Sequence, residues 1–158
     1  MCCICHEGME NKRDLMQLGC KHKFHLNCLI PMTRYSCPLC RCNFQDDMDA
    51  KLQEIVRDLP RLNDFTIDGV HSFIQKLKDV PPIEKIHREL LRDIMNAADI
   101  LVENMQNGRK REESTHLLKD IPHLDVSIRT EDYLLQVNWE YHVGSARLLK
   151  NTRFGFMF

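Results

Sequence analysis

The sequence predicts a small α+β segment in residues 1–45, followed by a mainly α-helical region, 46–158, that ends in a small antiparallel β element. Three observations support this division. All 8 cysteines of the 158-residue chain lie within its first 42 residues. Apolar residues recur at helical spacing from Ile83 to Met105. From Leu135 to Val143, apolar and polar residues alternate as they do in a half-buried strand.

Composition and charge exclude several classes of protein. The net charge is −1, and residues 1–45 carry six basic against three acidic side chains, so nucleic acid is not an expected partner. No apolar stretch approaches the roughly 20 residues that cross a bilayer, so we expect no membrane span. The opening residues, 1–5, lack the basic head and apolar core of a signal peptide. We therefore expect reduced thiols and a location in the cytoplasm and/or nucleus.

The cysteines belong to a ladder of eight potential metal ligands arranged in four pairs. In chain order these are Cys2, Cys5, Cys20, His22, His25, Cys28, Cys37 and Cys40. A two-residue gap lets both side chains of a Cys-x-x-Cys turn reach one zinc ion, and structural zinc takes four nitrogen or sulfur ligands. Eight ligands predict two closed structural sites, because a catalytic zinc would keep an open position. A segment of 45 residues buries too little core to fold alone, so the ions should supply much of its stability.

The order of these ligands resembles that of the RING finger family, in its two-histidine subclass. A plant-homeodomain finger places four cysteines before a single histidine, whereas here His22 is the fourth ligand and His25 the fifth. The resemblance covers residues 2–44 and implies a cross-brace α+β fold with two zinc ions, in which alternate pairs share an ion. Carried over, site one is Cys2, Cys5, His25 and Cys28, and site two is Cys20, His22, Cys37 and Cys40.

The resemblance also implies a RING-type E3 ubiquitin ligase, which binds a ubiquitin-conjugating enzyme and ubiquitin and promotes transfer to a substrate lysine without a covalent intermediate. The groove contacts carried over are Ile4, Pro38 and Leu39. Met32 stands where active members often have Trp, and it offers a less rigid contact. Arg41 follows the last ligand and resembles the family's linchpin, whose forked donors bridge both partners. The alternatives are a non-catalytic zinc-binding scaffold and, for Arg41, a solvated side chain.

Two cysteines, Cys3 and Cys42, are left over once both sites are full. We expect them to be reduced and non-ligating. Exchange with a neighbouring ligand, or oxidation, is the alternative.

The remainder of the chain predicts helices first. The acidic run at 45–49 suits the first turn of a helix that Pro60 stops. Thr66 can cap a second helix, which places Val70, Phe73, Ile74 and Leu77 on one face and ends before the prolines at 81–82. A third helix spans 83–105 and has Gly108 as its C-terminal stop. Its apolar stripe either packs against the two preceding helices or mediates self-association, so a homo-oligomer is an open expectation.

Strands are predicted after a charged loop at 107–114. Alternation marks 135–143, and it also occurs at Leu124, Val126 and Ile128 before it and at Phe154, Phe156 and Phe158 after it. By analogy with the family, residues 46–158 select the substrate or set the oligomeric state. Nothing in this region identifies the protein substrate.

Overall fold

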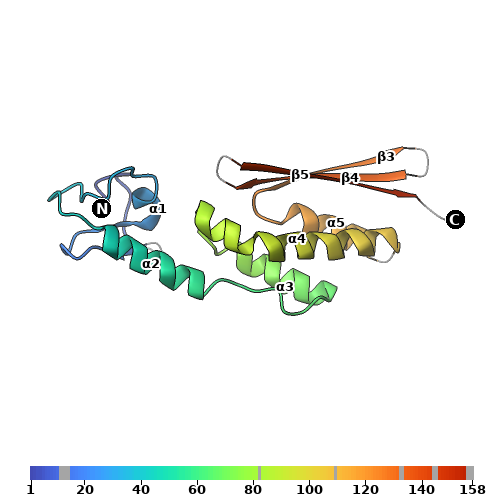
Figure 1. The fold of residues 1–158 in the computed structure, drawn as a ribbon, viewed down its shortest axis with the longest axis horizontal. Coiled ribbons are helices and arrows are strands. Elements are labelled where there is room, and N and C mark those ends of the chain that lie inside the picture. The colour runs from blue at the N-terminus through green and yellow to red at the C-terminus, as the bar shows by residue number, and fades with distance from the viewer. Residues whose placement is uncertain (11–14, 82, 109, 132–133, 144–145, 156–158) are drawn as a thin grey trace. The chain divides into compact units, whose positions relative to one another are not determined.

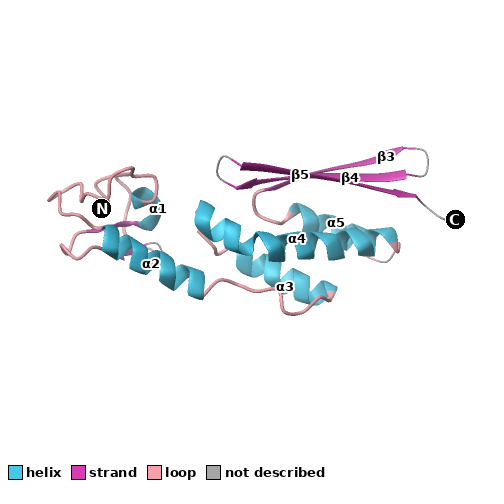
Figure 2. Ribbon diagram, in the orientation of Figure 1, coloured by secondary structure: helices cyan, strands magenta, loops and turns pink. Residues whose placement is uncertain are grey.

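The computed structural model describes every residue except 11–14, 82, 109, 132–133, 144–145 and 156–158. The chain divides into two compact units, Met1–Asp58 (unit 1) and Leu59–Phe158 (unit 2). Figure 1 shows the elements in chain order, and Figure 2 shows that strands occur in both units. None of the described helices has the length and apolar composition that crossing a membrane requires.

The described residues of unit 1 form two short strands and two helices around one small core. Strands β1 (Leu15–Gln17) and β2 (Lys23–His25) pair antiparallel. Helix α1 (Leu26–Leu29) follows β2 directly, and helix α2 (Gln45–Arg57) closes the unit. The buried residues of the core are Cys2, Met16, Leu18, Phe24, Leu26, Leu29, Cys37, Phe44 and Met48. Two of them are cysteines, so the predicted ligand groups are part of the core itself.

Helix α2 belongs to the same compact unit as the ligand ladder. Met48 is 2% exposed in the core, and Leu52 and Ile55 pack against it. The sequence division at residue 45 separates the ligand-bearing segment from this helix, whereas unit 1 extends to Asp58. The physical reason is that an amphipathic helix buries its apolar face on the nearest core, and the core of a 45-residue segment is incomplete without it.

Unit 2 combines a helical layer with a three-stranded sheet. Its helices are α3 (Ile67–Leu77), α4 (Glu84–Gln106) and α5 (Arg111–Lys119). The predicted cap of α3 is confirmed, because the Thr66 hydroxyl oxygen accepts the Gly69 amide at 3.1 Å. Helices α4 and α5 contact the sheet, and α3 packs on both of them (Figure 1). The four apolar residues predicted on one face of α3 are all buried.

The long apolar stripe forms the centre of unit 2. All of its predicted members are buried: Ile83, Ile86, Leu90, Ile94, Ala97, Leu101 and Met105. The stripe therefore packs within the molecule, but the elements that cover it are not the two preceding helices that were expected. Helix α4 packs against α3, α5 and strand β4, while α2 lies in unit 1. Gly108 follows the end of α4 with φ of +66°, as its predicted stop requires.

The prediction of a charged loop over 107–114 is wrong for its second half. Helix α5 begins at Arg111, and its buried residues Ser114, Leu117 and Leu118 share one helical face. Of the charged residues at its start, Glu112 is exposed and Arg111 and Glu113 are half-buried, and the buried residues that pack the helix come only after them. The run of charged residues predicts a loop, and it does not reveal the burial of Leu117 and Leu118 that follows.

The small antiparallel sheet is confirmed. Strands β3 (Leu124–Glu131), β4 (Leu134–Val143) and β5 (Ala146–Gly155) form a meander in the order β3-β4-β5. The predicted alternation in β4 buries Val137, Trp139 and Tyr141, and β4 contacts α4. The alternation expected at Phe156 and Phe158 falls outside the described residues.

Candidate metal centres

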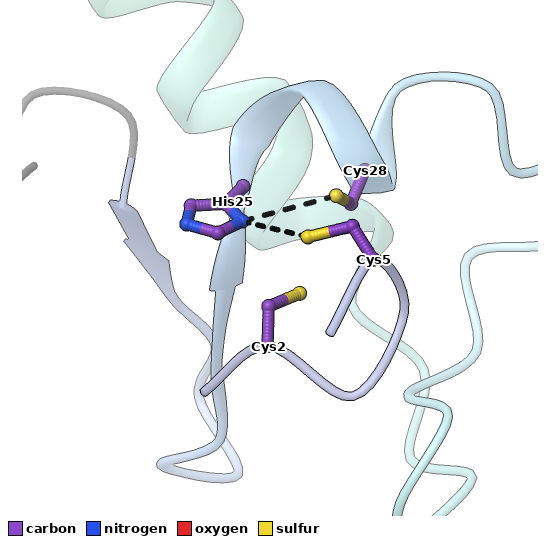
Figure 3. A group of neighbouring side chains, drawn as sticks. All are labelled: Cys2, Cys5, His25 and Cys28. Carbon is purple, nitrogen blue, oxygen red and sulfur yellow. Dashed lines mark hydrogen bonds between the residues drawn. The ribbon is translucent and has the colours of Figure 1, made fainter. Parts of the chain in front are cut away.

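The first ligand group joins three segments of unit 1. Cys2 and Cys5 come from the opening turn, His25 from the end of β2, and Cys28 from α1. Their four ligand atoms all lie within 4.8 Å of one another. Figure 3 shows the three thiols gathered about the imidazole of His25. These are the four residues that the family pattern assigns to site one.

The distances in this group suit a zinc ion. The Nδ1 atom of His25 is 3.3 Å from Sγ of Cys5 and 4.0 Å from Sγ of Cys28. A tetrahedral zinc with ordinary bond lengths to sulfur and nitrogen separates those two ligand atoms by roughly 3.6 Å. Three thiols and one imidazole are also a donor set typical of structural zinc. Donor chemistry and spacing therefore both fit the ion.

A backbone contact fixes which nitrogen of His25 is available to the metal. Its Nε2 lies 2.9 Å from the carbonyl oxygen of Gly8, which can only accept, so Nε2 carries the proton and donates. Nδ1 then keeps its lone pair and faces the thiols. Such a hydrogen bond on the far side of a ligating histidine orients the ring and raises the basicity of the bound nitrogen.

The second group also joins segments that are separate in the sequence. Cys20 and His22 lie on the turn between β1 and β2, and Cys37 and Cys40 lie in the Cys-Pro-Leu-Cys segment. Their ligand atoms are again within 4.8 Å of one another. Nδ1 of His22 is 3.4 Å from Sγ of Cys20 and 3.5 Å from Sγ of Cys37, which matches the same tetrahedral spacing.

The thiols of each group do not share one pKa. Burial acts to raise the pKa of Cys2, but backbone amides, that of Cys5 first, bring it down to about 6. Burial, together with the neighbouring thiols Cys5 and Cys2, raises the pKa of Cys28 to about 12. In the second group burial again acts to raise the pKa of Cys37, and backbone amides, that of Cys40 first, bring it down to about 7. Three thiolates this close repel one another, so full ionisation of a group calls for a cation at its centre.

Three ligand loops share an unusual backbone conformation. His6, Lys21 and Arg41 each directly follow a ligand cysteine, and their φ angles are 61°, 68° and 63°. Each of these loops is closed by a short hydrogen bond; the amide of Arg41, for example, donates to the carbonyl of Cys37 at 2.8 Å. The left-handed residue turns the chain back so that both ligands of a pair face the same point.

The predicted partner-binding residues differ in exposure. Ile4 is 37% exposed and Leu39 is 57% exposed, and Pro38 is exposed as well. Met32 is half-buried and packs against the core of unit 1. The structure thus leaves apolar side chains exposed on the first ligand loop (Ile4) and on the last ligand loop (Leu39). Met32, in contrast, buries part of its side chain in the core.

Arg41 is exposed at the end of the last ligand loop. The Ser36 hydroxyl donates to its carbonyl oxygen at 3.1 Å, which fixes the backbone of the loop. Within the part of the chain that the structure describes, the guanidinium makes no ion pair.

Cys3 and Cys42 are both exposed and lie outside the two ligand groups.

Sequence reasoning missed two supporting contacts. The Gly8 carbonyl is a backbone group and has no sequence signal. The carboxylate of Asp47, which accepts the Gly19 amide at 2.7 Å, lies in the acidic run, whose sequence pattern predicts only the start of a helix.

Comparison with known families places the ligand ladder in a recognised class. The sequence model described as "Ring finger domain" matches residues 1–41. Both Cys/His groups lie inside that span, and such a domain with two four-ligand groups is consistent with two zinc ions. No solved structure matches the chain.

Several curated proteins resemble parts of this chain. E3 ubiquitin-protein ligase SGR9, amyloplastic, of Arabidopsis thaliana is 40% identical over 58 residues, which are 35% of this chain and 20% of that protein. E3 ubiquitin-protein ligase RNF181 of Danio rerio is 34% identical over 62 residues, 38% of this chain and 39% of that protein. E3 ubiquitin-protein ligase TRAIP of Mus musculus is 24% identical over 128 residues, 72% of this chain and 26% of that protein. The chain thus spans well under half the length of each of these relatives.

Proposed function

Because residues 1–41 match the sequence model of a Ring finger domain, we propose that this chain is a RING-type E3 ubiquitin ligase. It binds a ubiquitin-conjugating enzyme through unit 1 and promotes transfer of ubiquitin to a lysine of a protein substrate. The observation that carries the proposal is the interleaving of the ligands. The first and third pairs along the chain form one four-ligand group, and the second and fourth pairs form the other, as the family pattern requires. Unit 2 then selects the substrate.

In this proposal the eight ligands hold two zinc ions, and the ions are structural. Zinc supplies folding free energy to loops that have little core of their own. His25 and Cys28 bring the end of β2 and helix α1 onto the opening turn, and Cys37 and Cys40 bring the last ligand loop onto the turn between the strands. The result is one rigid surface made of the first ligand loop, 2–5, and the last ligand loop, 37–40.

That surface recruits the conjugating enzyme through apolar contacts. Ile4 and Leu39 expose apolar side chains from loops far apart in the sequence. Pro38 restricts the backbone beside Leu39, which lowers the entropy lost on binding. Apolar anchors of this kind carry much of the free energy of an interface.

Arg41 acts on the transfer step. Its guanidinium offers a planar fork of donors that can bridge acceptors on two molecules at once. Holding ubiquitin and the conjugating enzyme together in one arrangement favours attack on the thioester by positioning alone. No residue of this chain needs to form a bond to ubiquitin.

The test is a ubiquitin discharge assay with a panel of charged conjugating enzymes and free lysine as acceptor. We expect wild type to accelerate discharge, and Arg41→Ala to slow it by about tenfold or more, as the loss of charged hydrogen bonds implies. Arg34→Ala is the matched control, because Arg34 is also exposed in unit 1 but does not follow a ligand. Arg41→Gly suits the positive φ at this position and should also lose activity. If no enzyme of the panel discharges faster with wild type, the ligase proposal fails.

A second candidate is a zinc-binding scaffold without transfer activity. The observation that favours it is Met32, which packs partly into the core. Active members of the family often have Trp at this position. A scaffold would bind the conjugating enzyme, lose that binding in Ile4→Ala, and leave the rate of discharge unchanged. Binding without acceleration would therefore favour this candidate over the first.

A further inference from the structure

Asp47 links helix α2 to a ligand loop that lies far away in the sequence. The residue is in the first turn of α2, and its Oδ2 accepts the amide of Gly19 at 2.7 Å across 28 positions. Hydrogen bonds with an ionised acceptor are shorter and roughly twice as strong as neutral ones. The contact does not depend on the small size of Gly19, because a Cβ at that position would lie 3.4 Å from the same carboxylate oxygen, an ordinary van der Waals distance.

The loop held in this way carries half of the second ligand group. Gly19 directly precedes Cys20, and the turn is closed by the Leu18 amide on the His22 carbonyl at 2.9 Å. The Lys21 amide also donates to the Leu18 carbonyl at 2.8 Å, with Lys21 in the left-handed region. A shift of Gly19 therefore moves Cys20 and His22 together.

The other end of the link is firmly anchored. Met48, the residue after Asp47, is 2% exposed in the core of unit 1, and this burial anchors the first turn of α2. Asp46 supplies a useful contrast, because it lies in the same helical turn and is exposed. Both carboxylates interact favourably with the helix N-terminus, but of the two it is Asp47 that accepts the Gly19 amide.

We infer that Asp47 is a positioning residue for the second zinc site. It orients the turn that presents Cys20 and His22 and so makes retention of that ion depend on helix α2. Groups that orient metal ligands typically change metal affinity by about 10- to 100-fold when they are removed. The zinc-binding unit accordingly extends to the end of α2. This inference rests on the zinc sites proposed above.

The experiment compares zinc loss from the full chain in wild type, Asp47→Ala, Asp47→Asn and Asp46→Ala. Zinc release to a chelator gives the rates, native mass spectrometry counts the ions that remain, and the imidazole nitrogen signals of His22 and His25 identify which site is empty. We expect Asp47→Ala to lose one ion at least tenfold faster than wild type, with the His22 signal changing first. Hydrogen exchange at the Gly19 amide should accelerate in the same variant.

The other variants separate positioning from a general loss of stability. Asp47→Asn keeps an acceptor oxygen and should recover part of the retention, while Asp46→Ala should match wild type. Equal release from Asp47→Ala and Asp46→Ala overturns the inference, as does loss of both ions at the same accelerated rate. A wild-type chain that binds fewer than two ions refutes the zinc sites themselves, and the role of Asp47 with them.

Discussion

Removal of zinc is expected to unfold unit 1 and to leave unit 2 folded. Each structural zinc contributes about 10–16 kcal/mol of apparent binding free energy, as much as or more than the roughly 5–15 kcal/mol by which a typical domain is stable. Helices α1 and α2 contain 4 and 13 residues, and α3, α4 and α5 contain 11, 23 and 9. Loss of unit 1 therefore removes 17 of the 60 helical residues among those that the structure describes, so the helical circular dichroism signal should fall by about 28%.

The single tryptophan reports on the other unit in the same sample. Trp139 lies in β4 and is 3% exposed, so its emission should stay at the wavelength of a buried indole while the helical signal falls. Replacement of the ligand Cys5 by Ser should reproduce the effect of a chelator, and replacement of the non-ligand Cys3 by Ser should not. A red shift of the emission together with the helical loss would refute independent folding. An unchanged helical signal after complete removal of zinc would refute a structural role of the ions.

Three further predictions concern unit 2 and can be measured by chemical denaturation followed through tryptophan emission. Thr66→Ala should lower the free energy of unfolding by about 1 kcal/mol through loss of the N-cap, and Thr66→Ser should not. A change of Gly to Ala normally stabilises a helix by about 1 kcal/mol. In Gly69→Ala, however, the added Cβ would lie 2.6 Å from the side chain of Asp64, so we expect destabilisation. A stabilised variant would contradict the packing. Burial, and then the charge of His123, lowers the pKa of His87 below its ordinary 6.5. The unfolded state therefore binds more protons, and stability should fall as the pH drops below about 6.5, with a weaker dependence in His87→Leu.

The ligand groups could be predicted from the sequence because metal spacing is a local rule. A Cys-x-x-Cys turn brings two thiols to one point whatever surrounds it, and the order of the pairs indicates a family in which their partners are known. The gathering of Cys2 and Cys5 with His25 and Cys28 follows that order. The Gly8 and Asp47 contacts could not be predicted, because both depend on how distant segments pack and not on spacing along the chain.

The helices show the same distinction between local and distant determinants. Thr66 and the apolar stripe from Ile83 to Met105 are local signals, and the structure realises both. Which elements cover that stripe is a tertiary question. Helix α2 has an apolar face of suitable period, but it buries that face on the core of unit 1. Helix α5 takes a place beside α4 although its first turn is charged, because Leu117 and Leu118 supply the contacts.

The positive φ angles of unit 1 bear on what Arg41 does. A left-handed conformation costs a residue with a side chain about 1–2 kcal/mol, and glycine adopts it freely, yet His6, Lys21 and Arg41 occupy the three positions. Since all three follow ligand cysteines, the conformation reflects the geometry of the loops and does not by itself mark a functional residue. What distinguishes Arg41 is chemical: its forked donors stand two positions from the exposed Leu39, on the loop that closes the second group. A variant that removes the guanidinium without disturbing the loop, as Arg41→Gly does, therefore separates the contribution of the side chain to ubiquitin transfer from that of the backbone to the zinc site.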